Sequence, residues 1–139
     1  MSSVKRGRGR PRREGADEEI LDVARDLLAE RGYRELTVDA VAERAGVAKT
    51  TVYRRWPSKG ALIAATIPPP PDTFDDADAV LREVTAILTP LADAEDDAEL
   101  LGVLRVVLGP RRTALAQLVG DTRADELLGA VVMRFFIAR

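Results

Sequence analysis

The sequence predicts an all-α protein, in which an N-terminal three-helix unit is followed by a short helical C-terminal domain. Apolar residues recur at helical spacing along most of the 139 residues, and no stretch shows the alternation of a β-strand. Glycines and prolines interrupt this pattern at intervals that suit short helices joined by tight turns. No internal repeat is visible.

The composition argues against several classes of protein. The chain has neither Cys nor His, so disulfides, thiolate chemistry and most zinc or acid–base enzymes are disfavoured. No nucleophile–base pair is visible, and we therefore expect no enzyme activity, no catalytic residue, no cofactor and no metal. No apolar run approaches the length of a membrane span or of a signal peptide, which favours a cytoplasmic protein with no membrane partner.

Charge is distributed unevenly along the chain. Residues 1–60 contain 14 basic and 10 acidic residues, whereas residues 61–139 contain 7 basic and 13 acidic ones. Within residues 1–13 glycine and proline alternate with six basic residues and no acidic one, which predicts a disordered basic arm. A basic arm on a basic half predicts binding to a polyanion, which the acidic half would repel.

Two helices are expected after the arm. The first follows the acidic residues at 17–19, whose charge suits a helix N-terminus, and ends at Gly32. The second has Thr37 as its N-cap, and Gly46 follows it at a position that suits a left-handed turn. Acidic residues at 93–99 are interpreted as helix caps and linker rather than as a calcium loop, because an EF-hand's glycine and spacing are missing.

A short helix from Lys49 to Trp56 follows directly, and Pro57 prevents it from continuing. Val52 and Trp56 lie four residues apart and would seat this helix on its neighbour, leaving a polar outer face. Ser58 is the expected cap of a fourth helix. This succession is the helix-turn-helix pattern, with the motif at residues 37–56 of a unit that covers residues 14–74.

The polar face of the 49–56 helix is suited to DNA. In helix-turn-helix docking the N-terminal residues of the second helix meet base edges, and neighbouring side chains meet phosphates. The expected base contacts are Lys49, Thr50, Thr51 and Arg55. The expected phosphate contacts are Thr37, Tyr53, Arg54 and Lys59.

The run from Thr37 to Lys59, Thr-Val-Asp-Ala-Val-Ala-Glu-Arg-Ala-Gly-Val-Ala-Lys-Thr-Thr-Val-Tyr-Arg-Arg-Trp-Pro-Ser-Lys, resembles the helix-turn-helix of TetR-type transcriptional regulators. The resemblance extends over about residues 14–74. It implies a homodimer that binds a palindromic operator in double-stranded DNA, usually as a repressor, with a C-terminal domain that binds an inducer. We expect a small apolar effector to release this repressor. It also places Trp56 at a packing position. Ala48 departs from the pattern, since the family often has a capping Ser there.

The arm carries a second, shorter signal. Arg8-Gly9-Arg10-Pro11 is similar to the core of an AT-hook, in which Arg8 and Arg10 would lie in the minor groove of A·T-rich DNA. A flexible tail that adds only nonspecific affinity is an equally good interpretation of the same residues.

The C-terminal domain, residues 75–139, is short for a TetR-type regulatory domain. Helices are expected near 77–92, 97–108, 111–119 and 123–138, divided at Pro90, at 93–97, at Gly109-Pro110 and at Gly120-Asp121. Arg111 and Arg112 are expected to be solvated. The last helix would expose an apolar strip, which a partner in a dimer would cover. The residues of that strip are Leu128, Val132, Phe135, Phe136 and Ile137.

Taken together, these patterns predict a bacterial, nucleoid-associated, sequence-specific transcriptional regulator. Two alternatives remain open. One is an architectural protein that binds DNA without sequence preference, and the other is a truncated relative that pairs with a full-length regulator.

Overall fold

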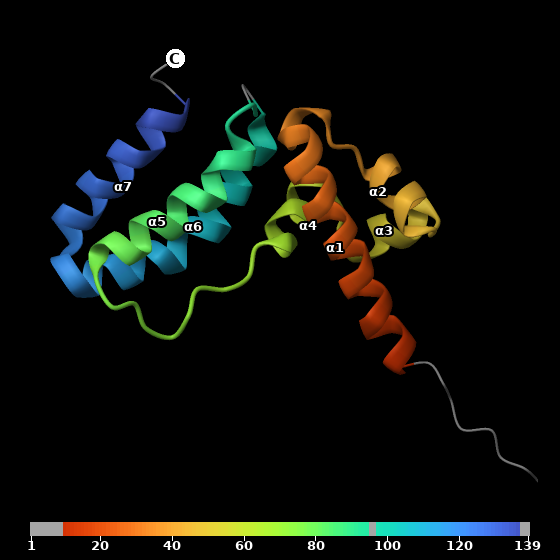
Figure 1. The fold of residues 1–139 in the computed structure, drawn as a ribbon, viewed down its shortest axis with the longest axis horizontal. Helices are drawn as coiled ribbons and strands as arrows, with labels where there is room; N and C mark the ends of the chain where they lie inside the picture. Colours follow the sequence, from red (N-terminus) through yellow and green to blue (C-terminus); the bar gives the residue numbers. More distant parts are fainter. Residues whose placement is uncertain (1–9, 95–96, 137–139) are drawn as a thin grey trace, which may run out of the picture.

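The computed structural model describes residues 10–94 and 97–136, and within these ranges it contains helices and turns but no strand (Figure 1). The first four helices are α1 (Arg10–Glu35), α2 (Val38–Ala45), α3 (Lys49–Arg55) and α4 (Lys59–Thr66). They are followed by α5 (Ala77–Leu88), the 3-10 helix η1 (Thr89–Leu91), α6 (Ala98–Val119) and α7 (Asp121–Phe136). Across the described ranges, no helix is long and apolar enough to span a membrane.

Helix α1 is longer than the sequence predicted. It begins at Arg10, so residues 10–13 are helical, although we expected them to belong to a disordered arm. Arg8 and the rest of residues 1–9 lie outside the described residues. The expected break at Gly32 is present, because Gly32 has φ 77° and ψ 175°, a conformation that is accessible almost only to glycine.

Local capping chemistry fixes the short helices that follow. The Thr37 hydroxyl accepts a hydrogen bond from the Ala40 N–H (3.1 Å), and the Ser58 hydroxyl accepts one from the Ala61 N–H (3.1 Å). Gly46 has φ 68° and ends α2, as expected. Ala48 provides no side-chain cap to α3, which agrees with the departure noted in the sequence.

The expected break at Gly109-Pro110 is wrong, since α6 runs without interruption from Ala98 to Val119. Proline removes only one N–H from a helix, and the carbonyl that loses its partner belongs to the exposed Val106, where water can replace it. The burial of Val107 and Leu115 on either side favours a continuous helix. The helix expected at 77–92 instead ends at Leu88 and continues as η1.

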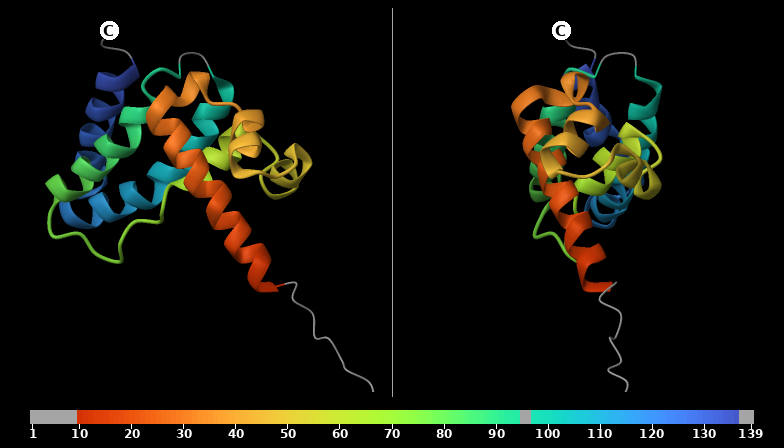
Figure 2. Two further views of the ribbon diagram at one scale, coloured as in Figure 1. Left: turned by 45° about the vertical axis from the view of Figure 1, so that its right-hand side comes forward. Right: turned by 90° about the vertical axis from the view of Figure 1, so that its right-hand side faces the viewer.

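Two apolar cores meet along α6. The first contains residues of α1 to α4 together with Leu91 and the first half of α6. The second contains α5, the later half of α6 and α7. Helix α1 crosses the middle of the molecule, with α2 and α3 on one side and α5 to α7 on the other (Figures 1 and 2). The N-terminal unit therefore shares its core with the C-terminal part.

Arg111 lies where the two cores meet, and it is buried rather than solvated, with 2% of its surface exposed. Its guanidinium forms an ion pair with Glu83 of α5 (2.5 Å) and donates to the Val107 carbonyl (2.8 Å) and to the Pro68 carbonyl (2.9 Å). These bonds join α5, α6 and the proline-rich linker around one charge. The adjacent Arg112 is more exposed and pairs with Asp121 and Asp125.

The expected apolar strip on α7 is largely covered within the chain itself. Leu128 is buried, and Val132, Phe135 and Phe136 are half-buried against the second core. Ile137 lies outside the described residues. Met133 of α7 and Leu118 of α6 remain exposed, at 51% and 44%.

Candidate nucleic-acid interface

The packing of α3 against the first core determines which of its side chains face solvent. Val52 is completely buried in the first core, and Trp56 packs against that core as expected from the sequence. Lys49, Thr50 and Arg54 are exposed, whereas Thr51 is half-buried. The helix therefore presents a polar, solvent-exposed face beside the Gly46 turn.

Lys49 stands at the start of α3 and is engaged by an acidic neighbour. Its ammonium lies 2.8 Å from Asp39 Oδ1 of α2 and 5.7 Å from the centre of the Tyr53 ring. The hydrogen bond from Lys49 to Asp39 raises the pKa of Lys49 above its usual value. Lys49 is thus fully charged at neutral pH and fixed over the exposed face.

Arg55 stands at the other end of α3 and is also paired. Its Nη1 lies 2.5 Å from Asp17 Oδ2 of α1, and its side chain is 39% exposed. The pair draws Arg55 towards α1, so one of its donors is already in use. Arg54, between Tyr53 and Arg55, forms no ion pair or hydrogen bond with the part of the chain that the structure describes.

The expected phosphate contacts have different surroundings. The Thr37 hydroxyl already caps α2, and Tyr53 is 40% exposed. The Lys59 ammonium lies 4.2 Å from the centre of the Tyr33 ring and donates to the Arg34 carbonyl (3.5 Å). Burial lowers the pKa of Lys59, although nearby carboxylates act in the opposite direction. Lys59 is therefore less available to a phosphate than the sequence indicated.

The minor-groove arm remains a prediction. Arg8 lies outside the described residues, and Arg10 is the first residue of α1. Helical backbone at Arg10 differs from the extended Arg-Gly-Arg geometry that an AT-hook requires.

Two carboxylates join the helix-turn-helix unit to the C-terminal part. From the sequence, both were expected to be helix caps or linker residues. Asp93 accepts hydrogen bonds from the N–H groups of Tyr33 (3.0 Å) and Arg34 (3.2 Å), and Glu99 accepts one from the Gly60 N–H (2.8 Å). Both contacts occur where a glycine permits close approach, since a Cβ on Gly60 would lie 3.1 Å from the Glu99 side chain. The sequence shows Gly32 and Gly60, but it does not indicate that Asp93 and Glu99, which are distant in the chain, pack against them.

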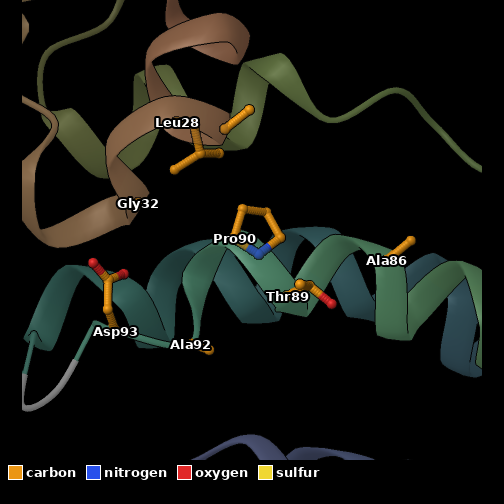
Figure 3. Close-up of a pocket in the computed structure, with 8 residues that line it drawn as sticks. Leu28, Gly32, Ala86, Thr89, Pro90, Ala92 and Asp93 are labelled. Atoms are coloured by element: carbon orange, nitrogen blue, oxygen red, sulfur yellow. The ribbon is translucent and has the colours of Figure 1, made fainter.

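A groove lies between α1 and η1, with a volume of about 740 Å³. Figure 3 shows Leu28 of α1 facing Pro90 of η1, and Gly32 opposite Asp93. One wall belongs to the helix-turn-helix unit and the other to the C-terminal part. The volume falls within the range of small-molecule sites, and the lining is mostly apolar.

A capped helix, a left-handed glycine turn and a short second helix with a polar outer face define a helix-turn-helix protein. Residues 20–66 match the family described as bacterial regulatory proteins, tetR family. This part of the chain therefore carries a helix-turn-helix domain of the tetR type.

Several proteins are similar to this chain. The uncharacterized HTH-type transcriptional regulator YdeS of Bacillus subtilis (strain 168) is 34% identical over 95% of this chain and 63% of YdeS. The uncharacterized HTH-type transcriptional regulator Rv1556 of Mycobacterium tuberculosis is 48% identical over 46% of this chain and 35% of Rv1556. The DNA-binding transcriptional repressor TetR of Mycobacteroides abscessus is 40% identical over 41% of this chain and 30% of that repressor. The chain therefore spans less than two thirds of each of these relatives.

Proposed function

We propose that this chain is a sequence-specific DNA-binding regulator of transcription that inserts α3 into the major groove. The observation that carries the proposal is the exposed polar face of α3, with Lys49 and Thr50 in its first turn, in a domain that matches the tetR family. Lys49 and Arg55 supply donors suited to guanine, and Arg54 is free to meet a phosphate. Such a protein acts in the cytoplasm, where bacterial DNA lies.

The proposal is tested by selecting duplexes from a random-sequence pool with the full chain. We expect an inverted repeat, with half-sites about 34–36 Å apart or a multiple of that distance. Lys49→Ala and Arg55→Ala should each weaken binding to the enriched duplex by about tenfold or more, the range of one lost bidentate base contact. The matched control is Arg82→Ala, which removes an exposed cation from α5, and it should bind like the unaltered chain.

Two results would count against this proposal. Enrichment of no sequence, with tight binding to every duplex, would favour the architectural alternative. Equal affinities of the unaltered chain, Lys49→Ala and Arg55→Ala would show that α3 is not the reading helix.

The chain is proposed to act as a homodimer. An inverted repeat requires two copies related by a two-fold axis, since each α3 reads one half-site. Helix α7 lies at the edge of the molecule farthest from α2 and α3 (Figure 1) and exposes Met133, so pairing there leaves both reading helices free. A monomeric mass in light scattering, with and without the enriched duplex, would contradict this part of the proposal.

We further infer that the regulator is a repressor released by a small apolar effector that binds in the groove between α1 and η1. Asp93 bonds one wall of the groove to the backbone at Tyr33 and Arg34, next to the start of α2. A molecule that separates the walls favours conformations in which the spacing of the two reading helices no longer fits the operator.

The effector site is tested with a panel of small aliphatic and aromatic compounds and a thermal-unfolding readout. Ala29→Phe fills the groove from an exposed position of α1, and Ala98→Phe adds the same ring outside it. Compounds that stabilise the unaltered chain and Ala98→Phe should fail to stabilise Ala29→Phe. Equal stabilisation of all three proteins would place the effector elsewhere.

A further inference from the structure

The two ends of α3 are each held by a carboxylate from a different helix. Lys49 is the first residue of α3 and pairs with Asp39 of α2 at 2.8 Å. Arg55 is the last residue and pairs with Asp17 of α1 at 2.5 Å. Both cations belong to the set expected to read bases, so acidic residues occur within the DNA-facing surface itself.

Carboxylates on a DNA-facing surface repel DNA and therefore lower its affinity for any duplex. Asp17 and Asp39 lie beside the cations that approach the duplex, where each negative charge opposes the phosphate backbone. Helix α2 does not require Asp39 as its cap, since the Thr37 hydroxyl already accepts the hydrogen bond from the Ala40 N–H. The Asp39 carboxylate is therefore left to pair with Lys49.

Each of the two cations has more N–H donors than its carboxylate occupies. A lysine ammonium has three N–H donors and an arginine guanidinium has five, so each cation can keep its carboxylate and still donate to a base edge. A phosphate carries a full negative charge, so it competes directly with the carboxylate for the cation, whereas a neutral base edge does not.

We propose that Asp17 and Asp39 are specificity-determining residues that suppress binding to non-matching DNA. They compete with DNA phosphates for the positive charges of Arg55 and Lys49. Recognition of the operator keeps both pairs intact, whereas nonspecific binding must break them. This inference rests on the function proposed above and adds to it the source of sequence discrimination.

The test compares Asp39→Asn and Asp17→Asn with the unaltered chain, on the enriched duplex and on a random duplex, over a range of salt concentrations. The controls are Glu43→Gln on α2 and Asp22→Asn on α1, which remove the same charge from exposed positions. Asp22 pairs with Arg25 of its own helix, at 2.6 Å, and not with α3. Because Asp39 lies in the first turn of α2, Asp17→Asn tests the same inference from a second helix should Asp39→Asn fold poorly.

We expect each test variant to bind random DNA at least about twofold more tightly than its control does, with a salt slope steeper by about 0.9, the value of one added phosphate contact. Affinity for the enriched duplex should change less, so the ratio of specific to nonspecific affinity falls. Variants whose ratio and slope match those of Glu43→Gln and Asp22→Asn would overturn the inference. Failure of the unaltered chain to enrich any sequence would instead refute the proposed function, which keeps the two failures distinguishable.

Discussion

Replacement of Arg111 by alanine is expected to lower the free energy of unfolding by about 3–5 kcal/mol, the range for removing one partner of a buried ion pair. Arg111 is 2% exposed and binds Glu83, the Val107 carbonyl and the Pro68 carbonyl. Without the guanidinium, the two carbonyls lose a charged donor, Glu83 loses its partner, and a void remains between the cores. Urea unfolding followed by circular dichroism measures the change.

The matched control is Arg112→Ala, on the next residue of the same helix. Arg112 pairs with Asp121 and Asp125 at the surface, so its loss should have little effect on stability. Combining Arg111→Met with Glu83→Leu should recover part of the lost stability, because no unpaired charge remains. A similar small effect of Arg111→Ala and Arg112→Ala would show that the Arg111 contacts do not hold the cores together.

Gly32→Ala is expected to destabilise the protein by about 3 kcal/mol or more, through strain and a steric clash together. Gly32 has φ 77° and ψ 175°, a conformation that costs a side-chain-bearing residue about 1–3 kcal/mol. A Cβ at this position would also lie 2.5 Å from Asp93 Oδ2. If Asp93 moved aside, its bonds to the Tyr33 and Arg34 N–H groups would be lost.

Gly46→Ala measures the effect of a positive φ without a steric clash. Gly46 also has a positive φ, of 68°, but a Cβ there would meet no atom within 4 Å. Its replacement should therefore cost only about 1 kcal/mol of conformational strain, measured in the same urea unfolding. Equal losses for Gly32→Ala and Gly46→Ala would show that the contact between Gly32 and Asp93 contributes nothing.

The sequence predicted those parts of the fold that depend on neighbours along the chain. Thr37 and Ser58 cap their helices through bonds to residues three positions away, and Gly46 ends α2 through its own backbone conformation. Val52 also took its expected place, because the four-residue spacing to Trp56 specifies one face of a short helix.

What the sequence could not predict depends on residues far apart in the chain. Pro110 normally ends helices, but here burial on both sides of it supports a continuous α6. The sequence suggests that Arg111 is a surface residue, because no local pattern indicates that the fold places Glu83 and Pro68 beside it. The pairing of Arg55 with Asp17 spans 38 residues, and no local pattern indicates it.

The central claim, that α3 reads base edges in the major groove, is tested most directly by methylation protection on the enriched duplex. Guanine N7 lies in the major groove and adenine N3 in the minor groove, so one reagent that methylates both atoms reports on both surfaces. We predict protection of guanine N7 in each half-site by the unaltered chain, and loss of that protection at one position per half-site with Lys49→Ala. Protection confined to adenine N3, or guanine protection that Lys49→Ala and Arg55→Ala leave unchanged, would contradict the claim.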